Sequence, residues 1–171
     1  AIELLVLDVD GVLTDGGIWV DDNGVETKEF HVRDGAGIAY WRRLEKRVAI
    51  ISGRSCRAVE HRAAELGIDR VYQGRLDKRP AFEELLALER LSARQACVVG
   101  DDLADVPPLR IAGVGVAVAD AVPEVKAAAH YVTLQPGGHG AVREVIEMLL
   151  RYQGRWAEVV ARYSGETNSP C

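Results

Sequence analysis

The stretch VLDVDGVLTD, residues 6–15, ends an apolar run with aspartates and a glycine. Acids on an exposed face would be solvated, but Asp8 and Asp10 alternate with Leu7 and Val9, where the chain should become buried. Carboxylates held close together repel one another unless a cation or hydrogen-bond donors compensate their charge. The stretch therefore predicts a buried strand that ends in a functional site rather than in an ordinary turn.

Three further apolar runs, at residues 48–51, 96–99 and 114–118, resemble the run at residues 4–7. Short and nearly continuous apolar runs are typical of parallel strands that are covered on both faces. Stretches of helical period lie between them. Their apolar faces are Ile38, Trp41 and Leu44 behind the cap candidate Asp34; Val59, Ala63 and Leu66 before Gly67; and Phe82, Leu85, Leu86 and Leu88. This alternation predicts an α/β fold with a doubly wound (Rossmann-like), mainly parallel sheet.

Two segments interrupt the alternation of strands and helices. Asn23-Gly24 is a turn signal between two short strand-like stretches, which predicts a β-hairpin flap over about residues 17–32, inserted after the first strand. From Gly137 onward, a glycine hinge followed by one long or two short helices should form a C-terminal lid over about residues 137–163.

The chain contains no internal linker long enough to divide it into domains. We expect residues 1–163 to form a single domain without a separate cap domain. The polar residues 164–171 should form a disordered tail.

The composition restricts the class of protein. The 171 residues carry a formal net charge of −5 and no basic stripe, which argues against a nucleic-acid partner. No apolar run approaches the roughly 20 residues of a membrane helix, and we see no basic-then-apolar leader. Cys56, Cys97 and Cys171 are odd in number and far apart, so we expect a reducing compartment, the cytoplasm.

Several polar side chains follow the predicted strands or precede a predicted helix. In chain order they are Asp8, Asp10, Ser52, Arg54, Lys78, Asp101, Asp102 and Asp105. Ligands of doubly wound sheets bind where the carboxyl ends of the strands converge. Each residue alone could be a turn, a helix cap or a solvated charge. Together, hard oxygen donors with little imidazole or thiol predict a site for Mg²⁺, which shares substrate phosphate oxygens.

Four motifs resemble the signature motifs of the haloacid dehalogenase superfamily phosphatases. They are DVDGVLTD (residues 8–15), ISGR (51–54), Lys78 and GDDLAD (100–105). The stretches FHVRDGAGI (30–38), YQGRLDK (72–78) and GGHGAVREV (137–145) are similar to a capless subfamily. That subfamily contains phosphatases of 3-deoxy-D-manno-octulosonate (KDO) 8-phosphate and of nonulosonate 9-phosphates. The resemblance implies a Mg²⁺-dependent phosphomonoesterase.

The resemblance also implies roles for five aspartates. Asp8 would be the nucleophile that takes the phosphoryl group as an aspartyl-phosphate. Asp10 would act first as general acid and then as general base. The carboxylates of Asp8 and Asp101 and the backbone carbonyl of Asp10 would hold the metal. Asp102 and Asp105 would orient the ligands and the metal-bound waters.

Five residues are candidates for substrate binding. Ser52, the neighbouring backbone at Gly53, and Lys78 would hold the phosphoryl oxygens. Arg54 and Arg62 could bind the carboxylate of a sugar acid, because the planar guanidinium matches a carboxylate.

The substrate within the subfamily is predicted from two positions. Nonulosonate 9-phosphate phosphatases typically have Glu where this chain has Arg54 and Lys where it has Glu65. The pattern in this chain resembles the KDO 8-phosphate type, which would release KDO and phosphate for a lipopolysaccharide-type precursor. A nonulosonate 9-phosphate or a broad range of sugar phosphates is the alternative.

The expected assembly is a homotetramer. Exposed Ile18, Trp19 and Val20 on the hairpin would otherwise be prone to aggregation, and in the resembling family neighbouring hairpins and C-terminal segments complete each pocket. The family typically has Arg or Lys where this chain has His139. Whether this position contributes a fixed positive charge is therefore left open.

Two other classes of protein have to be weighed. A signalling receiver domain also places acids, a hydroxyl and a lysine around Mg²⁺, but there the phosphoacceptor ends the third strand, not the first. A catalytically silent relative is the second possibility, although every catalytic position is filled here.

Overall fold

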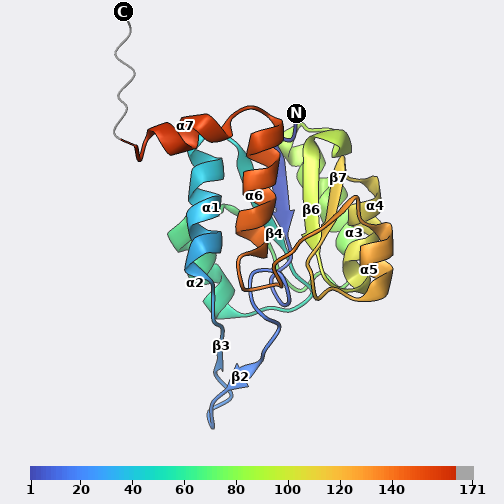
Figure 1. Ribbon diagram of the computed structural model, residues 1–171. Coiled ribbons are helices and arrows are strands. Elements are labelled where there is room, and N and C mark those ends of the chain that lie inside the picture. Colours follow the sequence, from blue (N-terminus) through green and yellow to red (C-terminus); the bar gives the residue numbers. More distant parts are fainter. Residues whose placement is uncertain (165–171) are drawn as a thin grey trace, which may run out of the picture.

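The fold is a six-stranded parallel sheet between two layers of helices, in a computed structural model that describes residues 1–164 (Figure 1). The strand order is β5-β4-β1-β6-β7-β8. The strands are β1 (Leu4–Leu7), β4 (Arg47–Ile51), β5 (Arg70–Tyr72), β6 (Ala96–Gly100), β7 (Val114–Ala117) and β8 (Tyr131–Val132). The predicted α/β class is therefore confirmed. Most of the tail expected to be disordered, residues 165–171, lies outside the described residues.

Strand β1 lies in the middle of the sheet, between β4 and β6, and all four of its side chains are buried. It pairs in parallel with β4 on one side and with β6 on the other, with Leu7 opposite both Ile50 and Val99. The three strands therefore end nearly level with one another. This register brings the residues that follow them to one edge of the sheet.

Helices cover both faces of the sheet (Figure 1). One face carries α1 (Val32–Arg43), α2 (Arg57–Leu66) and α6 (Ala141–Tyr152), and α7 (Trp156–Ala161) follows α6. The other face carries α3 (Lys78–Glu89), α4 (Val106–Ile111) and α5 (Pro123–Ala128). Two single 3₁₀ turns, η1 (Ala93–Gln95) and η2 (Leu103–Asp105), lie before and after β6. Within residues 1–164, no helix has the length and apolarity needed to cross a bilayer.

Two details differ from the sequence prediction. Leu88 of α3 is 54% exposed, so it does not belong to the buried face. Helix α1 begins at Val32 after His31, so Asp34 is not its cap. The Asp34 carboxylate instead accepts hydrogen bonds from the amides of Gly140 and Arg143 at the start of α6, a partner more than a hundred residues away that local patterns do not reveal.

The predicted hairpin is present, but its strands are shorter than the sequence suggests. Strands β2 (Trp19–Val20) and β3 (Glu26–Thr27) pair over only two residues each. The Asp21 carboxylate accepts hydrogen bonds from the amides of Asn23 and Val25 and so closes the tip. The hairpin projects from the end of the sheet opposite the N-terminus (Figure 1).

The segment after β8 packs tightly against the loop that follows β1. A Cβ at Gly137 would lie 1.7 Å from the carbonyl oxygen of Gly11, and the Gly138 amide donates a hydrogen bond to the Val12 carbonyl. Close approach of two backbones therefore favours glycine at both positions, and the φ of +67° at Gly138 favours it further. The predicted lid stays a prediction. Helix α6 then buries one complete face in the core.

Candidate active site at the ends of the central strands

The loop after β1 curls back on itself directly behind Asp8. The Val9 carbonyl accepts hydrogen bonds from the amides of Val12, Leu13 and Thr14, and also from the Thr14 hydroxyl. Gly11 has a φ of +86°, and a Cβ there would lie 2.1 Å from a carboxylate oxygen of Asp101. Glycine is therefore favoured at this position, because side chains rarely adopt this conformation and a Cβ would displace the Asp101 carboxylate.

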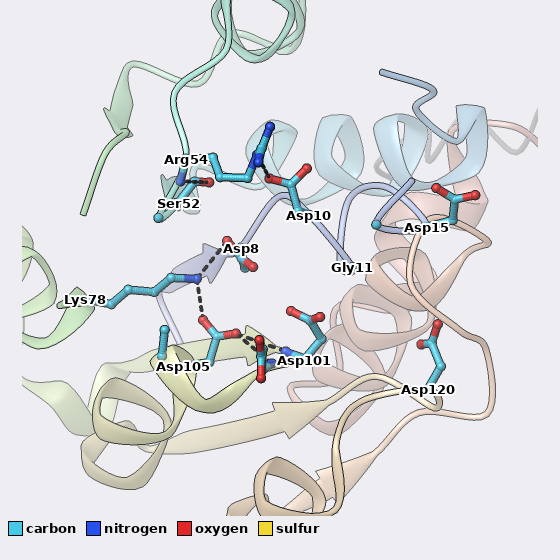
Figure 2. Close-up of a pocket in the computed structure, with 14 residues that line it drawn as sticks. Asp8, Asp10, Gly11, Asp15, Ser52, Arg54, Lys78, Asp101, Asp105 and Asp120 are labelled. Carbon is cyan, nitrogen blue, oxygen red and sulfur yellow. Dashed lines mark hydrogen bonds and ion pairs between the residues drawn. The ribbon is translucent and has the colours of Figure 1, made fainter. Parts of the chain in front are cut away.

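Lys78 joins two buried aspartates. It is the first residue of α3, and its Nζ lies 2.8 Å from Asp8 Oδ1 and 2.7 Å from Asp105 Oδ1 (Figure 2). The side chains of Lys78, Asp8 and Asp105 are all at least nine-tenths buried. A buried ammonium between two carboxylates compensates part of their charge and fixes their positions.

Asp105 uses both of its oxygens within the site. Oδ1 bonds Lys78, and Oδ2 accepts hydrogen bonds from the amides of Asp101 at 3.0 Å and Asp102 at 3.3 Å. It thereby holds the turn that follows β6. The exposed Asp102 carboxylate accepts a hydrogen bond from the Leu103 amide at the start of η2. The role predicted for Asp105, to orient the metal ligands and metal-bound waters, stays a prediction.

Asp8 and Asp101 have the geometry of a cation site. Carboxylate oxygens of Asp8, Asp101 and Asp105 lie within 4.8 Å of one another. Within residues 1–164, Asp101 Oδ1 is buried without a hydrogen-bond partner. Since Asp105 is committed to Lys78 and to two amides, Asp8 and Asp101 are the carboxylates with capacity for a hard cation such as Mg²⁺.

The electrostatics agree with this geometry. Burial, reinforced by the charge of Asp105 and opposed by Lys78, raises the pKa of Asp8 to about 6. Burial, together with the charges of Asp8 and Asp105, raises the pKa of Asp101 to about 8. Both carboxylates are therefore unfavourable in their charged form unless a cation compensates them.

The site opens into a pocket of about 410 Å³ (Figure 2). Ser52 follows β4 and is buried at the pocket wall, beside Gly53 and Arg54. The acidic side chains that line the pocket are Asp8, Asp10, Asp15, Asp101, Asp102, Asp105 and Asp120. Seven acids face only Arg54 and Lys78 among the lining residues, so the pocket is strongly negative and suited to a cation.

Asp15 and Asp120 were not predicted as site residues. Asp120 Oδ1 accepts a hydrogen bond from the Gly137 amide at 2.9 Å, so this residue ties the glycine segment to the pocket. Its position soon after the run at residues 114–118 was a signal that could have indicated it, because the other predicted strands end in the same way.

The hairpin contributes two further residues that sequence reasoning missed. Lys28 forms an ion pair with Asp10, and its Nζ lies 2.7 Å from Glu26 Oε1. Glu26 Oε2 lies 2.7 Å from Arg54 Nη2, and Arg54 Nε lies 3.7 Å from Asp10 Oδ2. These four charged side chains form a network at the rim of the pocket, which follows only from the fold of the hairpin.

Two candidate residues lie outside the pocket. Arg62 Nη1 pairs with Glu65 Oε2 at 2.8 Å, and its guanidinium lies over the ring of Phe30. His139 packs edge-on against His31, with ring centroids 6.4 Å apart, next to Asp34. Neither residue is among those that line the pocket within residues 1–164. Substrate binding by Arg62 therefore stays a prediction, and the charge at His139 stays open.

The chain is similar to known phosphatases over nearly its whole length. Residues 68–146 match the family model of haloacid dehalogenase-like hydrolases. The chain is 49% identical to the 3-deoxy-D-manno-octulosonate 8-phosphate phosphatase of Escherichia coli (strain K12) over 157 residues, 92% of this chain and 84% of that protein.

Solved structures agree. The same phosphatase from Moraxella catarrhalis, in complex with magnesium, phosphate and KDO, superposes with a TM-score of 0.93 at 39% identity, covering 95% of this chain and 93% of that chain. The cobalt-bound phosphatase from Haemophilus influenzae gives a TM-score of 0.87 at 42% identity, covering 90% of each chain. This chain belongs to the 3-deoxy-D-manno-octulosonate 8-phosphate phosphatase family of the haloacid dehalogenase-like hydrolases.

Proposed function

We propose that this chain is a Mg²⁺-dependent phosphomonoesterase that hydrolyses KDO 8-phosphate to KDO and phosphate. The observation that carries the proposal is the pair Asp8 and Asp101, two raised-pKa carboxylates beside Lys78 with one buried oxygen of Asp101 unpartnered. Family membership supplies the substrate class, since relatives that share about half of the residues are phosphatases of this sugar acid phosphate.

In the first half-reaction, Asp8 is the nucleophile. One of its carboxylate oxygens forms a bond to phosphorus, while the bond from phosphorus to the sugar oxygen breaks. Asp10 donates its proton to the departing sugar oxygen, which leaves as the alcohol. Asp8 then carries the phosphoryl group as an aspartyl-phosphate, and Asp10 is left as a carboxylate.

In the second half-reaction, Asp10 accepts a proton from a water molecule, whose oxygen attacks phosphorus. The bond between phosphorus and Asp8 breaks, which releases phosphate and restores the Asp8 carboxylate and the protonated Asp10. Each residue therefore returns to its starting state after one turnover.

The remaining residues position and neutralise the phosphoryl group. Mg²⁺ held by Asp8, Asp101 and the Asp10 carbonyl would compensate the negative charge of the phosphoryl oxygens. Lys78 lies against Asp8 and supplies a second positive charge. Ser52 and the amides near Gly53 line the same pocket and can donate hydrogen bonds to phosphoryl oxygens.

Arg54 is the residue we assign to the carboxylate of the sugar acid. It lines the pocket, and in this structure its guanidinium binds a carboxylate of the chain itself, that of Glu26. A substrate carboxylate would compete for the same donors. Arg62 does not line this pocket and pairs with Glu65, so its predicted role in substrate binding stays a prediction.

We further propose a homotetramer in which hairpins of neighbouring chains cover each pocket. Ile18, Trp19, Val20 and Val25 on the hairpin are each more than half exposed, and an apolar patch of this kind is typical of an interface. Light scattering at micromolar concentration should give four times the chain mass, and a monomeric mass would contradict this assembly. The free thiols of Cys56 and Cys97 fit the reducing cytoplasm, where we place the reaction.

A steady-state comparison tests the substrate. KDO 8-phosphate should give a higher kcat/KM than a nonulosonate 9-phosphate or glucose 6-phosphate, and EDTA should abolish turnover of all three. Arg54→Ala should reduce the preference for KDO 8-phosphate, whereas Arg57→Ala, an exposed arginine at the start of α2 outside the pocket, should leave it unchanged. Higher kcat/KM for either other substrate would refute the assignment.

A further inference from the structure

Lys28 is buried although it lies on an exposed hairpin. Its side chain is 1% exposed, although the residue as a whole is only half-buried. Trp19 and Val20 on the same hairpin are exposed, at 63% and 59% of the whole residue. Lysine is almost never fully buried unless its ammonium is paired. The fold therefore turns the Lys28 side chain inward, toward the rim of the pocket.

The partners of Lys28 are charged and belong to the site. Its Nζ bonds Asp10 Oδ1 and lies 2.7 Å from Glu26 Oε1. The second oxygen of Glu26 lies 2.7 Å from Arg54, which itself faces Asp10 Oδ2 at 3.7 Å. Each oxygen of Asp10 thus faces a cation, and Glu26 holds both cations in place.

We propose that Lys28 is a positioning residue for Asp10, the general acid and base of the phosphatase reaction, and that Glu26 fixes Lys28 for this task. This inference rests on the proposed function, because Asp10 has that role only in phosphoryl transfer. The hairpin then has a catalytic purpose within its own chain, in addition to any contact between chains.

The physical reason is orientation. A general acid must point at the oxygen that it protonates, within hydrogen-bond reach, and small misplacements of reacting groups are costly. Asp10 lies on the loop after β1, where its side chain is only partly buried, at 21% exposure. The bond to a buried ammonium leaves its carboxyl group one preferred direction.

Positioning of an acid can be distinguished from a purely structural ion pair by the leaving group. A sugar alkoxide leaves only with a proton, whereas p-nitrophenolate leaves without one. Loss of a positioned general acid therefore slows hydrolysis of KDO 8-phosphate far more than hydrolysis of p-nitrophenyl phosphate. A general loss of folding or of phosphate binding slows both substrates equally.

The experiment compares Lys28→Met, Lys28→Arg and Lys46→Met with the unmodified chain on both substrates in the presence of Mg²⁺. Lys46 is the matched control, a buried lysine paired with Glu3 at the opposite end of the sheet. Lys28→Met should lower kcat for KDO 8-phosphate by about 10²-fold and kcat for p-nitrophenyl phosphate by at most about threefold. Lys28→Arg should restore most of the difference, and Lys46→Met should keep the ratio of the two rates.

Equal losses on both substrates, or a rise in KM with unchanged kcat, would overturn the inference, because Lys28 would then be structural or substrate-binding. Failure of the proposed function gives a different result, since the unmodified chain itself would then not hydrolyse KDO 8-phosphate.

Discussion

Two lysines are buried at opposite ends of the sheet, and their surroundings differ. Lys46, at the amino ends of the strands, donates to the Ile2 carbonyl at 2.7 Å and to the partly exposed Glu3 at 3.1 Å. Lys78, at the carboxyl ends, bonds two buried aspartates, and the buried Asp101 oxygen nearby has no partner within residues 1–164. Lys46 therefore pairs with one acidic side chain, whereas Lys78 pairs with two and lies near a third, Asp101.

The comparison separates structural charge from functional charge. At the amino end, positive and negative charges balance and the acid can reach water, so the pair can stabilise the fold without a ligand. At the carboxyl end, several carboxylates share one ammonium, which is unfavourable without an added cation. We infer that the second arrangement is retained because it binds a metal and a phosphate ester, at a cost in stability.

The largest effect should come from Asp8 itself. Asp8→Asn removes the nucleophile, and turnover of every phosphate ester should fall by more than about 10³-fold. Steady-state rates with KDO 8-phosphate and p-nitrophenyl phosphate measure the loss. Glu3→Gln, the corresponding change beside Lys46, should leave both rates within about twofold, as expected for a surface pair. Activity retained by Asp8→Asn would show that the carboxyl end of the sheet does not carry the nucleophile.

The pH dependence of stability should differ between the free and the metal-bound protein. In the folded protein the pKa of Asp8 is raised from its ordinary 3.8 to about 6, and that of Asp101 to about 8. The folded state therefore binds more protons than the unfolded state between these values, and the free energy of unfolding falls as pH rises from about 4 to 8.

Asp8 alone corresponds to a loss of about 3 kcal/mol over this range, at 1.36 kcal/mol per pH unit. Urea denaturation in EDTA at a series of pH values measures the slope, and saturating Mg²⁺ should flatten it. A stability that rises through this window in EDTA would contradict the charge assignment.

Substitution of the two lysines compares the two ends directly. Lys78→Met should lower kcat by about 10²-fold or more, because the phosphoryl group and Asp8 lose a positioned positive charge. Lys46→Met should change kcat by less than about twofold while it lowers the free energy of unfolding by about 1–3 kcal/mol, since the Ile2 carbonyl loses its donor. Equal kinetic losses in the two variants would mean that both lysines are only structural.

Substitution of two glycines, Gly137 and Gly113, allows the same comparison with the smallest expected effects. A Cβ at Gly137 would lie 1.7 Å from the Gly11 carbonyl oxygen, and a Cβ at Gly113 would lie 2.1 Å from the Arg94 carbonyl oxygen. Each change to alanine should cost about 1–3 kcal/mol of stability through overpacking. Only Gly137→Ala should also reduce kcat, by about tenfold, because the loop that carries Asp10 must shift. Denaturation and steady-state rates measured in parallel would show whether the effects separate in this way.

The strand-end residues were predictable from the sequence because each follows an apolar run. Asp8, Ser52 and Asp101 come directly after β1, β4 and β6, and the parallel register brings them together. Strands β5 and β8 were not predicted, since runs of three and two residues carry too little pattern.

Residues that act across long sequence distances could not be inferred. Lys28 reaches Asp10 only because the hairpin returns the chain to the loop after β1. Asp34 likewise caps a helix that begins 107 residues later in the chain, at Ala141. Leu88 illustrates the opposite error, because a leucine at nearly the right helical spacing can still face solvent.

The most direct test of the central claim is the free energy of unfolding of the unmodified chain and of Asp8→Asn at pH 8, with and without Mg²⁺. We predict that the variant is the more stable protein in EDTA, because an amide there relieves the repulsion with Asp101 and Asp105. In saturating Mg²⁺ the order should reverse, because the unmodified chain gains the binding energy of the metal. If the unmodified chain is the more stable one in EDTA, or if Mg²⁺ stabilises both proteins equally, the carboxyl end of the sheet is not the strained cation site described above.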